Sequence, residues 1–215
     1  MTTYGFLHTA GTHVPVFDKL LADISPADHA VHVVDASLLT DARRRHGADD
    51  DLRARIGTRI AELAGHGAVA LVCTCSTIGA TAEEMGGTLG VPVTRVDRAM
   101  ARTAVRSGDR IAVVAAVEST IAPTRALLAE SADAAGRPVE LVDAPCLDAW
   151  SLFEAGDHEG YVARLAAHLA AIDGSVDVIV LAQASMAPVE SRVQLRSLLL
   201  SSPRLAVEDL VSGRR

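Results

Sequence analysis

Two cysteines stand where a short apolar run gives way to hydroxyl-bearing residues. The run 69–73 is followed at once by Thr74, Cys75, Ser76 and Thr77. A thiol can take up or release a proton, and neighbouring hydroxyls can donate hydrogen bonds to a carboxylate. Cys73 lies one step deeper on the same strand face, which favours a place in the core. The segment predicts proton transfer or nucleophilic chemistry at Cys75; the alternative is that both cysteines are small buried hydrophobic residues.

The same segment leads from an expected strand into an expected helix. Thr81 and Glu84 have capping-box spacing, which places the helix over 80–89. A helix N-terminus offers backbone N–H donors and the positive end of the helix dipole, which suit a carboxylate ligand and lower the pKa of a thiol. A metal-binding Cys-x-Cys would need further ligands that the sequence does not offer, so we expect no metal.

Short β-branched runs alternate with amphipathic stretches along the whole chain. Strands that are apolar throughout and separated by helices predict an α/β fold with parallel sheets flanked by helices. The expected strands are 4–7, 30–34, 69–73, 110–115, 139–142 and 176–181. The expected helices are 14–21, 50–64, 80–89, 95–107, 123–135, 160–172 and 190–200.

An internal repeat divides the chain into two similar halves. Residues 4–23 align with 111–130 at an offset of 107, and 71–78 align with 179–186 at 108. Between them, 34–36 align with 142–144, again at 108. Three matches in order indicate a duplication. We therefore expect a first α/β half over 1–100, a second over 101–202 and a C-terminal helix, 203–215, packed back on the first half.

Ligands of open α/β sheets bind at the carboxyl ends of the strands. Two halves related by a pseudo-two-fold axis would bring the ends of their first and third strands around one inter-domain cleft. Polar residues at those ends are the candidates for substrate contact. The first half supplies His8, Thr9, Cys75, Ser76 and Thr77, and the second supplies Ser119, Thr120, Gln183 and Ser185.

These motifs resemble the aspartate/glutamate/hydantoin racemase superfamily over nearly the whole chain. The segment 75–77 is similar to that family's small residue, Cys, Asn/Ser, Thr motif, and 181–187 to its second cysteine motif. The resemblance implies an isomerase that needs neither pyridoxal phosphate nor a metal. It also implies two cysteines flanking the substrate α-carbon, a small carboxylate substrate held by hydroxyls and backbone amides, and a tendency to form homodimers.

The resemblance fails at one position, because Gln183 stands where the family has its second cysteine. A glutamine cannot act as acid or base near neutral pH. His8 could replace the missing base, since histidine titrates near neutrality, and Cys146 is a weaker candidate. By the repeat, Cys146 should correspond to Ser37 or Leu38. Two alternatives remain open: a one-cysteine decarboxylase or lyase, and a non-catalytic carboxylate-binding protein. Arylmalonate decarboxylases are the mirror case, with the second-half cysteine only.

Composition narrows the remaining possibilities. The net charge of −7 and the scarcity of basic clusters argue against nucleic acid as a partner. No signal-peptide pattern and no membrane-length apolar run is visible, and the three cysteines form no disulfide framework. We therefore expect a cytoplasmic protein without a membrane partner. The other histidines are expected on the surface or on helix faces: His13, His29, His32, His46, His66, His158 and His168.

Overall fold

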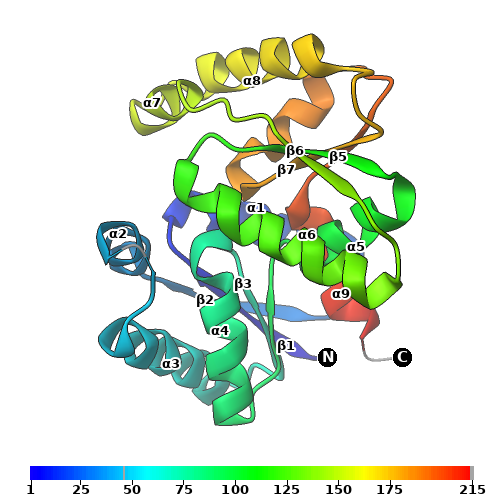
Figure 1. Ribbon diagram of the computed structural model, residues 1–215. Helices are drawn as coiled ribbons and strands as arrows, with labels where there is room; N and C mark the ends of the chain where they lie inside the picture. The colour runs from blue at the N-terminus through cyan, green and yellow to red at the C-terminus, as the bar shows by residue number, and fades with distance from the viewer. Residues whose placement is uncertain (46, 214–215) are drawn as a thin grey trace. The chain divides into compact units, whose positions relative to one another are not determined.

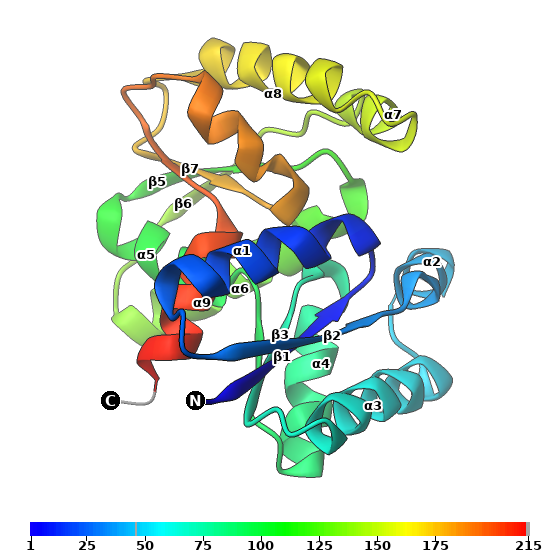
Figure 2. The ribbon, with the colours of Figure 1, turned by 180° about the vertical axis from the view of Figure 1, so that it is seen from behind.

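The computed structural model describes residues 1–45 and 47–213, which excludes His46 and the last two residues of the expected C-terminal helix. The chain forms two compact units (Figures 1 and 2). The first comprises Met1–Val96 together with Pro203 onward, and the second comprises Asp97–Ser202. In the described residues each unit holds one four-stranded parallel sheet flanked by helices. The expected α/β class is confirmed.

The first unit is built on strands in the order β2-β1-β3-β4. All three ladders are parallel, and β1 is central. Its strands are β1 (Thr3–His8), β2 (His29–Val34), β3 (Ala70–Cys73) and β4 (Val93–Arg95). Its helices are η1 (Gly11–His13), α1 (Val14–Ile24), α2 (Ala36–Arg45), α3 (Asp50–Gly65), α4 (Ser76–Leu89) and α9 (Ser202–Ser212).

Side chains of β1 alternate between two cores, as the period of a strand requires. Tyr4 and Phe6 pack with Phe17 of α1 and Val207 of α9. Leu7 points to the opposite face and packs with a cluster that α2, α3 and α4 supply. Figure 2 shows α1 and α9 on one side of this sheet and α3 and α4 on the other. A sheet covered on both faces explains why these strands are apolar throughout.

The second unit has the strand order β6-β5-β7-β8, and all of its ladders are parallel. Figure 1 shows α7 and α8 on one side of this sheet and α5 and α6 on the other. Its strands are β5 (Arg110–Val114), β6 (Glu140–Asp143), β7 (Val178–Leu181) and β8 (Leu198–Leu200). Its helices are α5 (Arg98–Ser107), η2 (Glu118–Thr120), α6 (Ile121–Ala135), α7 (Ala149–Glu154), α8 (His158–Ile172) and η3 (Ala184–Arg192).

The two sheets share their register at the first and third strands. Leu7 pairs with Cys73 as Val114 pairs with Leu181, which reproduces the sequence offsets of 107 and 108. The second strand differs. The backbone N–H of Asp35 donates to the oxygen of His8, and that of Cys146 donates to the oxygen of Ala115.

Cys146 therefore takes the ladder position of Asp35, at an offset of 111 rather than 108. The expected correspondence of Cys146 with Ser37 or Leu38 is wrong. The reason is that apolar strand segments look alike in sequence, so only the hydrogen-bond ladder fixes their register.

Two expected helices need correction. Residues 190–200 do not form a helix, because the chain leaves η3 at Arg192 and enters strand β8 at Leu198. Helix α4 begins at Ser76, four residues before its expected start, so Thr81 and Glu84 lie inside it and form no capping box. The Ser-Thr-Ile-Gly run has weak helix propensity, and tertiary packing overrides it. No helix of the described residues is long and apolar enough to cross a membrane.

Candidate active site

The thiol of Cys75 lies where β3 gives way to α4. Cys75 is the N-cap residue of this helix and has extended backbone angles, φ −116° and ψ 112°. In the described structure its side chain makes no capping hydrogen bond to the helix. The residue is 8% exposed, whereas Cys73 is fully buried in the core. The positive end of the α4 dipole therefore lies beside the Cys75 thiol, which retains a small exposure to solvent. The core position expected for Cys73 is observed.

A buried arginine that the sequence analysis missed supports the first turn of α4. Arg95, at the end of β4, is 3% exposed, and its Nη2 donates to the backbone oxygen of Ser76 at 3.5 Å. Its backbone N–H donates to Glu83 in the middle of the same helix. Gly79 permits this approach, because a Cβ there would lie 2.7 Å from Cβ of Arg95. Arg95 is paired with Cys73 across the β3–β4 ladder and lies 22 residues away in sequence, so no local motif indicates it.

His8 lies at the end of β1 and is fully buried. Its Nδ1 is 2.8 Å from Thr74 Oγ1, and its Nε2 is 2.9 Å from Nδ1 of His32. Burial, together with the charges of His32 and His13, lowers the pKa of His8 to about 3. Both ring nitrogens are occupied, so His8 would have to break one of these bonds to act as a base.

The remaining first-unit candidates surround the same strand ends. Thr9 and Ser76 are buried, and Thr77 is half-buried. Because β1 and β3 are hydrogen-bonded neighbours, the structure brings Thr9 to the strand end next to the one that leads into Cys75. Within this unit the hydroxyls of Thr9, Ser76 and Thr77 therefore lie at the carboxyl ends of neighbouring strands of one sheet.

Gln183 occupies the corresponding strand end in the second unit. Its Oε1 accepts hydrogen bonds from the backbone N–H of Ala116 at 2.7 Å and of Val117 at 2.9 Å. The residue is 8% exposed and precedes η3, as Cys75 precedes α4. Gln183 therefore binds the two backbone amides that follow β5 with its oxygen, and it leaves its Nε2 hydrogens to donate elsewhere.

The second-unit hydroxyls make mostly local contacts. Thr120 Oγ1 donates to the oxygen of Val117 at 2.7 Å and does not cap α6. Ser185 is half-buried and its Oγ is 3.2 Å from the hydroxyl of Tyr161. Burial raises the pKa of Tyr161 to about 12. Ser119 is half-buried in η2. The structure brings these residues to the ends of β5 and β7.

Cys146 is a core residue of the second unit. It is 1% exposed and packs among apolar side chains of α8 and η3. Burial raises the pKa of its thiol, and its Sγ lies 3.6 Å from Asp148 Oδ1. A raised pKa disfavours the thiolate, so Cys146 is a poor candidate base. No group of three or more His, Cys, Asp or Glu side chains among residues 1–45 and 47–213 is arranged to hold a metal.

Two histidines expected on the surface or on helix faces are half-buried and lie against aromatic rings of the first unit. His32 stacks on Phe6 with ring centroids 5.3 Å apart, and its Nε2 is 2.9 Å from Asp18 Oδ1. His13 buries its Nδ1 against His8, with ring centroids 6.1 Å apart. The sequence did not indicate the contact between His32 and Asp18, because Asp18 is on α1 and no residue spacing within β2 points to it.

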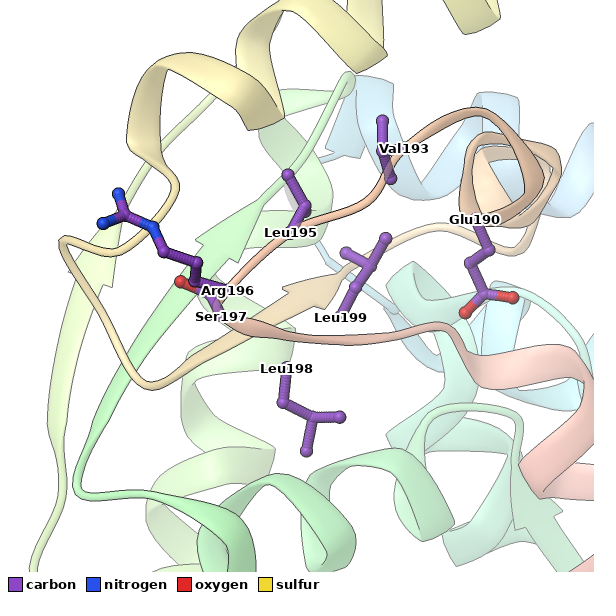
Figure 3. A pocket seen from close by; sticks show the side chains of 7 residues that line it. All are labelled: Glu190, Val193, Leu195, Arg196, Ser197, Leu198 and Leu199. Carbon is purple, nitrogen blue, oxygen red and sulfur yellow. The ribbon is translucent and has the colours of Figure 1, made fainter.

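A separate cavity of about 410 Å³ lies in the second unit (Figure 3). None of the expected site residues lines it. Ser197, one of its lining residues, donates to the backbone oxygen of Val176 ahead of β7, away from the carboxyl end of that strand. The cavity is lined by Glu190, Val193, Leu195, Arg196, Ser197, Leu198 and Leu199.

Parallel sheets flanked by helices, with polar residues at the strand ends, define this chain as an α/β protein. The sequence matches the model of the Asp/Glu/hydantoin racemase family over residues 12–210. The chain belongs to that family. No curated protein matches it by sequence.

Solved structures of the same fold include racemases and a decarboxylase. Aspartate racemase from Picrophilus torridus is 12% identical, with a TM-score of 0.75, 99% of this chain covered and 95% of that one. Glutamate racemase RacE1 from Bacillus anthracis is 16% identical, with a TM-score of 0.69 and coverage of 99% and 81%. Unliganded arylmalonate decarboxylase is 17% identical, with a TM-score of 0.60 and coverage of 99% and 92%.

Proposed function

We propose that this protein is a cofactor-independent, racemase-type enzyme that acts at a carbon next to a carboxylate, with Cys75 as its acid/base. The observation that carries the proposal is the position of Cys75 as the extended N-cap of α4, with some access to solvent. Membership of the racemase family supports the class of reaction.

The reaction begins when the thiolate of Cys75 removes the proton on the substrate α-carbon. The electron pair of that C–H bond then delocalises into the neighbouring carboxylate as an enediolate. Hydroxyls of Thr9, Ser76 and Thr77 and the backbone amides of the first turn of α4 stabilise this charge. The Cys75 thiol then exchanges its proton with solvent, and its return of a solvent-derived proton to the carbon completes an exchange of the α-hydrogen; inversion requires that a proton reach the opposite face of the enediolate instead.

Gln183 favours a second candidate, a one-cysteine decarboxylase. Its Oε1 is engaged by two backbone amides, and a carboxamide transfers no proton near neutral pH. In that reaction the bond between the α-carbon and one carboxylate breaks and CO₂ leaves. The electron pair of the broken bond stays on the α-carbon. The Cys75 thiol then protonates that carbon from one side. A cytoplasmic location is part of the proposal and is supported by the three cysteines, none of which is in a disulfide.

Hydrogen exchange tests the role of the thiol. A panel of 2-amino and 2-aryl carboxylic acids is incubated with enzyme in D₂O, and the α-proton is followed by NMR. Wild type should exchange the proton of at least one acid, and Cys75→Ala and Cys75→Ser should lose that exchange. Cys146→Ser, a second buried thiol, is the matched control and should retain it.

Release of CO₂ from 2-substituted malonates distinguishes the two reactions. Exchange accompanied by loss of optical activity supports the racemase, and CO₂ release without racemisation supports the decarboxylase. Exchange or decarboxylation that survives both Cys75 variants would contradict the proposed thiol role. Substrate binding without either reaction would instead indicate a carboxylate-binding protein.

A further inference from the structure

A continuous chain of hydrogen bonds crosses the first unit from the surface of α1 to the residue before Cys75. Asp18 Oδ1 is 2.9 Å from His32 Nε2, and His32 Nδ1 is 2.9 Å from His8 Nε2. His8 Nδ1 is 2.8 Å from Thr74 Oγ1, which in turn donates to the backbone oxygen of Leu7 at 3.1 Å. The chain connects α1, β2, β1 and the end of β3.

With the Thr74 hydroxyl donating to Leu7, the number of hydrogens available sets the direction of the other bonds. Thr74 has one hydroxyl hydrogen and donates it to Leu7, so its oxygen accepts from His8 Nδ1–H. A neutral His8 then has a bare Nε2, which must accept from His32 Nδ1–H. The carboxylate of Asp18 is an acceptor only, so His32 Nε2 also carries a hydrogen. His32 is therefore doubly protonated and positively charged in this arrangement.

The surroundings of the two histidines suit this assignment. The ring of His32 stacks on Phe6 at 5.3 Å with an interplanar angle of 18°, a position in which an imidazolium is attracted by the ring face. His32 also keeps 13% of its side chain exposed, which limits the cost of its charge. His8 is fully buried and contacts the ring of Phe17 at 5.6 Å, so it is the member that stays neutral.

A further titratable group that faces these residues is His13 of η1, whose ring centroid is 6.1 Å from that of His8. Burial lowers the pKa of His13, which disfavours a further positive charge beside His8. Asp18 is the acidic member of the chain and lies on α1, with its side chain 54% exposed.

We propose that Asp18, His32 and His8 are positioning residues that hold the Thr74 hydroxyl on the Leu7 carbonyl and so fix the end of β3 that carries Cys75. The hydrogen-bonded residues act through the backbone, because His8 contacts Phe17 of α1 on one face of the sheet and Cys75 packs in the core on the other face. Their effect on catalysis rests on the proposed function of Cys75, whereas their proton arrangement does not.

The arrangement has one competitor, which makes it testable. If His32 loses its Nδ1 hydrogen, His8 must donate from Nε2 and accept from Thr74 at Nδ1, and the Thr74 bond to Leu7 is released. The tautomer of His8 therefore reports the charge of His32. Imidazole ¹⁵N chemical shifts distinguish the two tautomers of His8 in the full-length protein.

In neutral buffer we expect wild-type His8 to carry hydrogen on Nδ1 and His32 to carry it on both nitrogens. Asp18→Asn removes the anion and should switch His8 to the Nε2–H tautomer. Asp23→Asn, on the same helix but paired with exposed Lys19, is the matched control and should leave His8 unchanged. Wild-type His8 with its hydrogen on Nε2, or no change in Asp18→Asn, would overturn the proposal.

Kinetics test the positioning role separately. His32→Gln should lower kcat of α-proton exchange by about tenfold with little change in KM, because small displacements of a reacting group are costly. His29→Gln, an exposed histidine on the same strand, should leave both unchanged. A normal kcat in His32→Gln would refute the positioning role. If instead the Cys75 variants retain activity, the proposed function fails. The NMR result still tests the proton arrangement of Asp18, His32 and His8, because it does not depend on Cys75.

Discussion

The side-chain oxygen of Gln183 accepts the backbone N–H of Ala116 at 2.7 Å. A second bond, from Val117, completes a clamp on the two residues that follow the central strand of the second unit. Gln183 thus has a structural task of its own. It satisfies two buried donors that a thiol, as a weak acceptor, would satisfy poorly.

This clamp predicts how the second unit responds to substitution. Gln183→Leu keeps most of the volume but leaves both amides without their acceptor, so the free energy of unfolding should fall by about 1–3 kcal/mol. Gln183→Glu retains an oxygen acceptor and should lose less. Urea denaturation of both variants measures the difference. Equal loss in the two would show that the hydrogen bonds to Ala116 and Val117 contribute little.

The close approach of Arg95 to α4 predicts opposite effects of alanine at two glycines of one helix. Gly79→Ala places a Cβ 2.7 Å from Cβ of Arg95, so it should destabilise the first unit by roughly 1–3 kcal/mol. Gly87→Ala has no neighbour within 4 Å and should stabilise by up to about 1 kcal/mol. Thermal or urea unfolding checks both, and a neutral Gly79→Ala would mean that Arg95 moves freely.

The three cysteines should react with alkylating reagents in a definite order. Cys75 is the most exposed of them at 8%, and burial raises the pKa of the Cys146 thiol. Iodoacetamide should therefore modify Cys75 first, as measured by peptide mass spectrometry over time. Cys75→Ser should leave the native protein almost unreactive. Faster labelling of Cys146 would contradict the burial described for it.

The lowered pKa of His8 predicts that the folded protein loses stability in acid. The folded-state pKa of His8, about 3, lies below the ordinary value of 6.5, so the unfolded chain binds a proton first as the pH falls. The stability that His8 contributes is complete above about pH 6.5 and is lost progressively towards pH 3. Between pH 7 and 5 the stability difference between wild type and His8→Gln should shrink by about 2 kcal/mol.

Urea denaturation at the two pH values measures this difference. His29→Gln is the control, because His29 is exposed and the variant should show no such narrowing. A gap between wild type and His8→Gln that stays constant with pH would mean that His8 is not held neutral.

Much of the fold could be predicted from local pattern. Apolar runs located β1, β3, β5 and β7 to within about two residues, because a strand buried on both faces leaves a continuous hydrophobic signature. Segments whose residues have weak or mixed propensity were misjudged, such as 190–200 and the first turn of α4. Their conformation depends on packing that a local window does not contain.

By itself the sequence determined the α/β class, the family and the strand ends that carry Cys75 and Gln183. These follow from periodicity and from short motifs, which are contiguous in the chain. Only the tertiary structure decided which side chains meet there. Gln183 contacts amides 66 and 67 residues away, and His8 contacts Thr74 66 residues away. Such partners are set by strand register and helix packing. The residues that surround Cys75 and Gln183 could therefore be identified only from the tertiary structure.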